Sequence, residues 1–274
     1  MALWNAQNDI NSQYGDIYEE LALEAFSQDE LELLAILGDE QQAAVKEGRT
    51  VNWDRILALS GLYLGGMTWQ KRFRESIAAQ VRATGEDLAV RFGQDAGAID
   101  NFLRSQTFDE YVLKFAQPIN QTTGENLSTL LKSAMDEGWS IPKTSGHLET
   151  MFKQYMQGDQ TDFEWFADRI PPYRRDMIAR TESIRAGGFA ANELYKSWGV
   201  SQKQWLAERD GRTCPYCLEM DGKIIGVGDD FFKKGDRFTV EGAGTLNLDF
   251  QNVIYPPLHP NCRCTLIPVV DTAR

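Results

Sequence analysis

The sequence is poor in basic residues for its size and has no long apolar run. Its 274 residues contain 28 Lys and Arg against 40 Asp and Glu, a formal net charge of −12. Binding nucleic acid over a whole surface requires neutralising phosphates, so this balance disfavours that class of protein. The longest uncharged stretch, residues 56–70, is shorter than the ~20 apolar residues that a membrane-spanning helix needs. The first residues show neither a basic leader nor an apolar core, so we expect no secretory signal and no membrane partner.

Histidine and cysteine are also scarce, with two and four residues respectively. A catalytic zinc needs a His or Glu beside its ligands as a base, and a nuclease of the His-Asn-His kind needs one histidine to activate water and usually another to hold the metal. His147 ends a segment, residues 138–147, that is interrupted by proline, glycine and serine. We expect a domain boundary in this segment and a solvent-facing loop position for His147. The shortage of histidine therefore predicts a protein that is not an enzyme.

The composition is otherwise that of a folded protein, with 42% hydrophobic and 11% aromatic residues. Acidic residues are concentrated at the start, where residues 1–50 hold eleven of them against Lys46 and Arg49. Such an arm either meets a basic partner or forms the solvated face of a helix. The eleven acidic residues are Asp9, Asp16, Glu19, Glu20, Glu24, Asp29, Glu30, Glu32, Asp39, Glu40 and Glu47.

Hydrophobic spacing predicts helices over the first 140 residues. Leucines recur at helical spacing in residues 28–40. Ser27 and Glu30 have the spacing of a capping box, which predicts that a new helix begins at Ser27. A further helix is expected over residues 53–82, and others follow it.

The pattern changes in the second half of the chain. Pro171 and Pro172 predict the start of a long helix, and Gly199 predicts its end. Short β-like runs follow on both sides of the dipeptide at residues 221–222, Asp-Gly, which favours a tight hairpin turn. Residues 245–251 alternate as a half-buried strand would, and the segment beginning at residue 262 predicts a final strand.

Together these patterns predict an α+β fold. A mainly helical region with an acidic arm occupies residues 1–165. A small α+β domain with a long helix, a β-hairpin and a short sheet occupies residues 166–274.

Soft metal ligands are gathered near the end of the chain. Cys214 and Cys217 form a C-x-x-C pair, and "HPNCRC" supplies His259, Cys262 and Cys264. A zinc site needs three or four such ligands, usually delivered in closely spaced pairs. Five candidates for four positions predict a structural Zn²⁺ that staples the hairpin to the last strand, and which of the two later cysteines takes the fourth position stays open. A disulfide or a reduced cluster without metal are the alternatives.

Four separated segments resemble the Mu protein F-like family, the minor head or head morphogenesis proteins of tailed bacteriophages. The resemblance covers about residues 165–270. The segments are "IARTES" (178–183), "LYKSWGV" (194–200), "WLAERDGRTCPYCLEMDGKII" (205–225) and "YPPLHPNCRCTLIPV" (255–269).

The resemblance implies a component of the virion, located in the phage head after synthesis in the host cytoplasm. Its implied partners are the portal protein, other head or scaffold proteins and packaged double-stranded DNA. It carries no catalytic role over to this chain. The residues that match the family motifs are Arg180, Thr181, Glu182, Asp210, Cys214, Cys217, Asp221, Gly222, His259, Cys262 and Cys264.

Three other interpretations compete with this one. Some proteins with such a domain carry a fused ADP-ribosyltransferase, and "RTE" at residues 180–182 is a weak match to that chemistry. A zinc-dependent nuclease or another phage DNA-processing enzyme would need histidines that this chain lacks.

A DNA-binding helix is the third interpretation, because residues 169–185 contain five arginines against two acids. The alternative is that those arginines form ion pairs with acidic helices of the same chain. The five are Arg169, Arg174, Arg175, Arg180 and Arg185.

Overall fold

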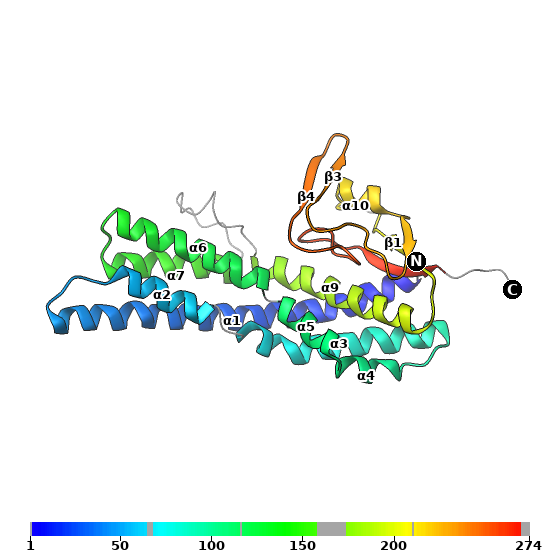
Figure 1. Cartoon of the computed structure of the whole chain (residues 1–274), viewed down its shortest axis with the longest axis horizontal. Helices are drawn as coiled ribbons and strands as arrows, with labels where there is room; N and C mark the ends of the chain where they lie inside the picture. Colours follow the sequence, from blue (N-terminus) through cyan, green and yellow to red (C-terminus); the bar gives the residue numbers. More distant parts are fainter. Residues whose placement is uncertain (1, 65–67, 116, 158–173, 210, 270–274) are drawn as a thin grey trace. The chain divides into compact units, whose positions relative to one another are not determined.

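The computed structural model of the protein is mostly helical with a small antiparallel sheet (Figure 1). It describes residues 2–64, 68–115, 117–157, 174–209 and 211–269. The predicted domain boundary at residues 165–166 and the proline pair at 171–172 lie outside these residues, and so does Asp210. The helices are α1 (Ala2–Glu47), α2 (Trp53–Leu64), α3 (Thr68–Phe92), α4 (Ala98–Leu103), α5 (Gln106–Phe115), α6 (Gln117–Asp136), α7 (Ile141–Gln157), α9 (Arg174–Ser197) and α10 (Pro215–Met220). The strands are β1 (Gln202–Leu206), β2 (Ile224–Gly226), β3 (Asp236–Val240), β4 (Gly244–Leu248) and β5 (Thr265–Val269).

The chain forms two compact units, which are described separately. We call one the sheet unit; it comprises Met1–Tyr18, Arg74–Tyr111 and Met177–Arg274. The other, the helical unit, comprises Glu19–Phe73 and Val112–Asp176. No helix in the part of the chain described here is both long and apolar enough to cross a membrane.

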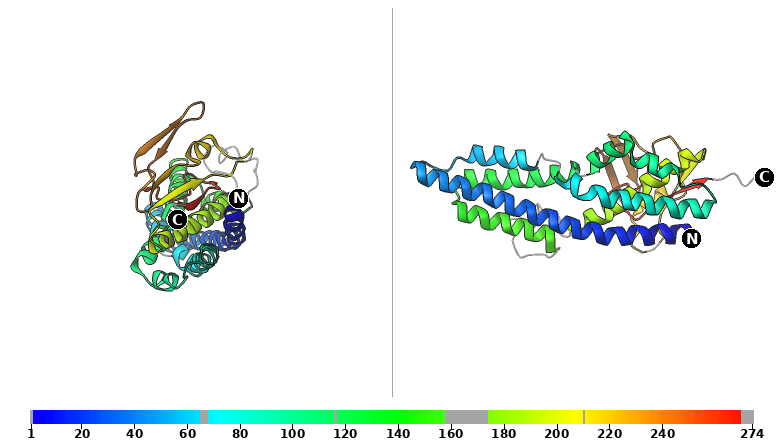
Figure 2. Two further views of the ribbon diagram at one scale, coloured as in Figure 1. Left: turned by 90° about the vertical axis from the view of Figure 1, so that its right-hand side faces the viewer. Right: turned by 90° about the horizontal axis from the view of Figure 1, so that it is seen from below.

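Aromatic packing forms the core of the helical unit. Phe26 of α1 contacts Trp69 of α3 and Tyr155 of α7, each with ring centroids 4.9 Å apart. Phe152 lies 5.5 Å from Tyr155 in an edge-to-face arrangement, a favoured geometry for buried rings. Helix α2 packs against α6, and α6 packs against α7 (Figure 2).

Two sequence predictions for this unit are wrong. Ser27 begins no helix, because it lies exposed in the middle of α1. The apolar positions on both sides of it continue one buried stripe, which outweighs the local capping preference. The segment at residues 138–147 is not a loop, since α7 begins at Ile141 with Pro142 in its first turn, where proline is tolerated. His147 is therefore helical, and its ring stacks on Trp139 with centroids 4.2 Å apart.

Two of the eleven acidic residues near the start are buried. Asp29, 2% exposed, accepts hydrogen bonds of 3.0 Å from the Tyr63 hydroxyl and the Trp69 indole. Glu40, also 2% exposed, supports the connection from α1 to α2. The other nine are exposed or half-buried, as expected for the solvated face of a helix.

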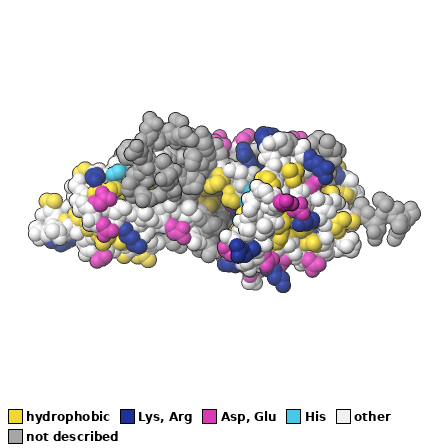
Figure 3. Space-filling view, turned by 90° about the horizontal axis from the view of Figure 1, so that it is seen from above, with side chains coloured by type: hydrophobic (Ala, Val, Ile, Leu, Met, Phe, Trp, Pro, Cys, Tyr) yellow, Lys and Arg dark blue, Asp and Glu magenta, His cyan; other side chains and the backbone are white. Residues whose placement is uncertain are grey.

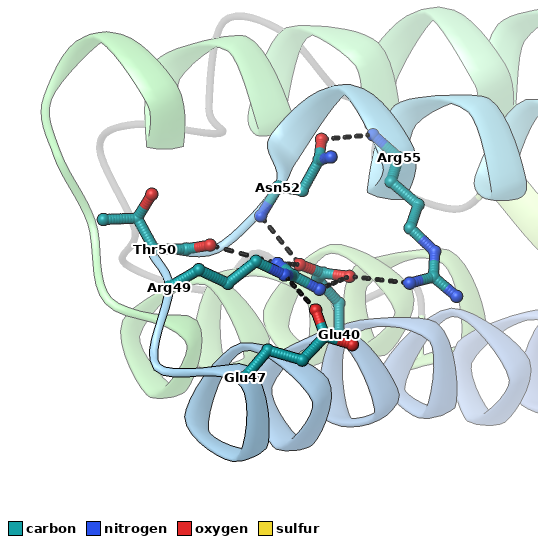
Figure 4. A network of polar contacts seen from close by, with 6 residues as sticks. All are labelled: Glu40, Glu47, Arg49, Thr50, Asn52 and Arg55. Carbon is teal, nitrogen blue, oxygen red and sulfur yellow. Dashed lines mark hydrogen bonds and ion pairs between the residues drawn. The ribbon is translucent and has the colours of Figure 1, made fainter.

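Glu40 collects donors from the whole α1–α2 connection (Figure 4). Its carboxylate accepts from the Arg49 guanidinium, from the Asn52 backbone N–H at 2.8 Å and from Arg55 at 3.4 Å. The hydrogen bond from Arg49, followed by that from Asn52, lowers the pKa of Glu40. A buried carboxylate surrounded by donors in this way fixes the turn between the two helices.

Replacing Glu40 by Gln should lower the melting temperature at neutral pH, because the amide carries no negative charge to pair with two arginines and has one acceptor oxygen in place of two. The depressed pKa stabilises the fold above the unfolded-state value near 4.5, and this contribution is lost as the pH falls through the folded-state pKa. The difference between Glu40→Gln and wild type should therefore shrink in acid, as measured by thermal denaturation against pH. Glu47→Gln is the control, since Glu47 pairs with the same arginine but is 57% exposed, and exposed pairs contribute little. Equal losses in the two variants would contradict the role of Glu40.

The sheet unit packs helices against a three-stranded antiparallel sheet in the order β2-β1-β5. In the β1–β5 pair Trp205 lies opposite Leu266, and both are fully buried. Strands β3 and β4 form a separate hairpin, and α10 contacts β3 (Figure 1). Helix α9 ends at Ser197, and Gly199 follows with φ of +70°, so its predicted end is confirmed.

Strand predictions in this unit are partly correct. Residues 245–251 do contain a strand, β4, with Leu248 buried. The two β-like runs on either side of residues 221–222 are confirmed as β1 and β2, which pair antiparallel. They are not joined by a tight hairpin, because Pro215 and the Cys214 cap start helix α10 between them. Cys262 and Cys264 precede the last strand, β5, which begins at Thr265.

Strand β1 carries a fully buried lysine, Lys203. Its Nζ donates to Asn192 Oδ1 of α9 at 2.9 Å and lies 5.8 Å from the centroid of the Phe231 ring. Burial, with a smaller effect of Lys196, lowers the pKa of Lys203 to about 8, against the opposing effects of Asp230, Asp229 and Glu193.

Since an unfolded lysine titrates near 10.5, the unfolded chain binds more protons than the folded one between the two pKa values. The free energy of unfolding should consequently rise as the pH increases from about 8 to 10.5. Lys203→Met should lose this rise, as measured by denaturant unfolding across that window. The exposed Lys132→Met is the control and should keep it. An unchanged pH dependence in Lys203→Met would show that Lys203 is not the group responsible.

Candidate metal centre

The first donor pair is placed by the first turn of α10. Cys214 is the N-cap, and its sulfur accepts a hydrogen bond from the Cys217 backbone N–H at 3.4 Å. One helical turn therefore brings the two sulfur atoms to the same side. Asp221 ends the helix, and its carboxylate accepts from the Ala207 N–H at 2.9 Å and pairs with Arg209 at 2.6 Å. These bonds tie α10 to the end of β1.

The second donor segment is the turn at residues 259–264. The Cys262 N–H donates to the His259 carbonyl at 3.2 Å, and Asn261 between them has φ of +62°. His259 Nδ1 lies 2.7 Å from the Pro260 carbonyl oxygen. That carbonyl is an acceptor, so Nδ1 carries the proton and Nε2 is left with its lone pair. A histidine held in this way is ready to bind a metal through Nε2.

The two segments meet at Cys217. His259 Nε2 lies 3.0 Å from Cys214 Sγ and 3.2 Å from Cys217 Sγ, and Cys217 Sγ lies 3.7 Å from Cys262 Sγ. The donor atoms form two overlapping groups, Cys214-Cys217-His259 and Cys217-Cys262-Cys264, and within each group all atoms lie within 4.8 Å of one another. Cys217 is common to both.

One of these separations matches a tetrahedral metal ion. Zn–S bonds of ~2.3 Å in tetrahedral geometry place two sulfur atoms ~3.8 Å apart, close to the Cys217–Cys262 separation. Cys217, Cys262 and Cys264 are almost fully buried, whereas Cys214 and His259 are half-buried. All five sequence candidates are thus brought together, and the cluster could hold a metal ion.

The thiols are electrostatically coupled. Hydrogen bonds from Cys217 and Cys264 lower the pKa of Cys262 well below its usual range. The hydrogen bond to Cys262, together with burial, raises the pKa of Cys217. A metal ion would bind these groups as thiolates, so metal binding would release protons.

The "RTE" residues have structural partners. Glu182 is 4% exposed and pairs with Arg185 on the same helix at 2.5 Å, and burial raises its pKa against the opposing effect of Arg185. The Thr181 hydroxyl accepts a hydrogen bond from Asn261, a role that sequence reasoning missed. Thr181 and Asn261 both lie in segments that resemble the family, and this was the only signal in the sequence that pointed to them.

Of the arginines in the arginine-rich segment, the structure describes the side chains of Arg180 and Arg185 alone. Arg185 is engaged with Glu182 and pairs within its own helix, not with the acidic N-terminal region. Arg180 is exposed. Arg169 and the side chains of Arg174 and Arg175 lie outside the described part. On the face drawn in Figure 3, basic and acidic side chains are interspersed.

The family model described as "Phage Mu protein F like protein" matches residues 125–267, slightly more than half of the chain. The match begins within α6, earlier than the expected start near residue 165. NAD(+)–arginine ADP-ribosyltransferase EFV of Enterococcus faecalis is 34% identical over 98 residues, which are 34% of this chain and 18% of the relative. The chain thus spans less than a fifth of that protein's length. No solved structure matches the chain.

Proposed function

Because the chain belongs to the phage Mu protein F-like family, we propose that it is a minor head protein that associates with the portal during head morphogenesis. Membership of the family indicates a phage head-related protein located in the virion. The match over residues 125–267 is the observation that carries the proposal. Association with the portal and a part in DNA packaging are the finer roles proposed here. The division into a helical region, residues 1–165, and a head-protein domain, residues 166–274, remains part of the proposal.

The proposed contribution of the metal centre is structural. We assign the four ligands of a Zn²⁺ ion to Cys214, Cys217, His259 and Cys262. Cys262 is proposed as the fourth ligand, with its sulfur at tetrahedral distance from that of Cys217. The ion would join α10 to the turn before β5 and so close the sheet unit.

The similarity to an ADP-ribosyltransferase does not favour an enzymatic role. It covers 18% of the relative, and the printed activity belongs to that whole protein. In this chain Glu182 is buried against Arg185, so its carboxylate is not presented to a substrate. We propose that the matching segment serves a structural purpose in this chain.

The assigned ligands predict distinct effects of two cysteine substitutions. Cys217→Ser should abolish binding of roughly one equivalent of zinc and melt the sheet unit at lower temperature, because metal binding contributes folding free energy. Cys264→Ser is the matched control, since Cys264 is equally buried but lies outside the assigned set; it should retain the metal. Elemental analysis and thermal denaturation measure both effects. A folded wild-type protein without zinc would overturn the metal assignment, and loss of zinc in both variants would put Cys264 in the place of Cys262.

The head role is tested by association with the portal. Co-purification with co-expressed portal protein should recover this chain, and purified particles should contain it. Replacing the exposed acids Asp16, Glu20 and Glu24 by their amides leaves the buried face of α1 intact and separates a role of the acidic arm from a role of the rest. Absence from both portal complexes and particles would overturn the proposed role and leave the metal assignment untouched.

A further inference from the structure

Two family motifs that are far apart in sequence meet in the sheet unit. Thr181 lies in the "IARTES" segment of α9, and Asn261 lies in "HPNCRC". Thr181 is 7% exposed, and the Asn261 backbone N–H donates to its hydroxyl oxygen at 3.1 Å. The contact joins a long helix to the turn that carries half of the proposed metal ligands.

The Thr181 hydroxyl is held in one orientation by two bonds. It donates its proton to the Met177 carbonyl, one helical turn earlier, at 2.6 Å. Its oxygen lone pair is then directed away from the helix and accepts from Asn261. Since the donor and acceptor functions of the hydroxyl are both used, the oxygen is a fixed acceptor and not a freely rotating group.

Asn261 occupies a backbone conformation that needs support. Its φ of +62° is in the left-handed region, which is uncommon for residues other than glycine but is tolerated by asparagine. Arg180 adds a second contact from α9, with its guanidinium 3.4 Å from Asn261 Oδ1. The helix therefore contacts both the backbone and the side chain of the residue at the centre of the turn.

The position of Asn261 decides where two ligands lie. His259 precedes it by two residues and Cys262 follows it directly, and the turn is closed by the bond from Cys262 N–H to His259 O. A shift of Asn261 would therefore change two distances at once, from His259 Nε2 and from Cys262 Sγ to the Cys217 sulfur. Residues that orient metal ligands from the second layer set metal affinity in this way.

We propose that Thr181 is a positioning residue for the metal centre, acting through the backbone of Asn261. The proposal rests on the metal assignment made under the proposed function. Thr181 touches neither the ion nor its ligand atoms; it holds the turn in the arrangement that binding requires. Without this bond the turn must be ordered when the metal binds, which weakens affinity.

The test compares three variants of the full chain by competition for Zn²⁺ with a chromophoric chelator. Thr181→Val keeps the shape but removes the hydroxyl, and it should weaken zinc binding by roughly ten- to a hundredfold. Thr181→Ser restores the hydroxyl and should bind nearly as wild type does. Thr144→Val is the matched control, because Thr144 is buried on α7 and its hydroxyl also donates to the carbonyl four residues earlier, at 3.1 Å. It should leave zinc affinity unchanged.

Amide hydrogen exchange at Asn261 provides the second measurement. In the zinc-free state this amide should exchange faster in Thr181→Val than in wild type, while the amides of β1 should not change. Wild-type zinc affinity in Thr181→Val, or a loss that Thr181→Ser does not restore, would overturn the role of Thr181 alone. A wild-type chain that binds no zinc would overturn the metal assignment and this proposal together, so the two failures are distinguishable.

Discussion

The sheet unit depends on the meeting of two chain segments at the Cys217 sulfur. This sulfur lies within 3.2 Å of His259 Nε2 and 3.7 Å of Cys262 Sγ, although both partners lie more than forty residues further along the chain. Between them the chain forms β2 and the β3–β4 hairpin, which supply few large buried side chains. A metal ion held by this thiol and imidazole cluster would close the long loop and would contribute folding free energy that a small core cannot provide.

Helix α9 contacts the segments that this cluster joins and holds them in place. Four of its residues, at spacings of seven, four and three, contact four different parts of the unit from one helical face. Thr181 accepts from Asn261, and Gly188 allows the Pro256 carbonyl to approach where a Cβ atom would lie only 2.8 Å from it. Further along, Asn192 accepts from Lys203 of β1, and the Tyr195 hydroxyl donates to the Leu266 carbonyl of β5. The helix thus positions the turn at residues 259–264, the loop around Pro256 and the two strands β1 and β5.

Several of these features could be predicted from the sequence, for identifiable reasons. The stripe through Thr181, Gly188 and Tyr195 follows from helical periodicity, and the ligand cluster follows from the scarcity of cysteine and histidine, which leaves few combinations. The partners of the stripe could not be predicted, because hydrogen bonds across eighty residues leave no local pattern. The helix at Pro215 was missed because its cap is a cysteine, outside the usual set of capping residues. Ser27 was misleading for the opposite reason, since a good local cap was overridden by a continuous buried face.

The burial of Thr181 and Glu182 bears on how the family motif is interpreted. A catalytic glutamate must reach a substrate, yet Glu182 lies in the core and is neutralised by Arg185 on the same helix. The Thr181 hydroxyl accepts from Asn261 in the turn at residues 259–264, and the exposed Arg180 contacts the side chain of the same residue. Each residue of the motif thus has a partner within the sheet unit. A motif used in this way is explained by the stability of the domain, which favours a role in assembly over one in catalysis.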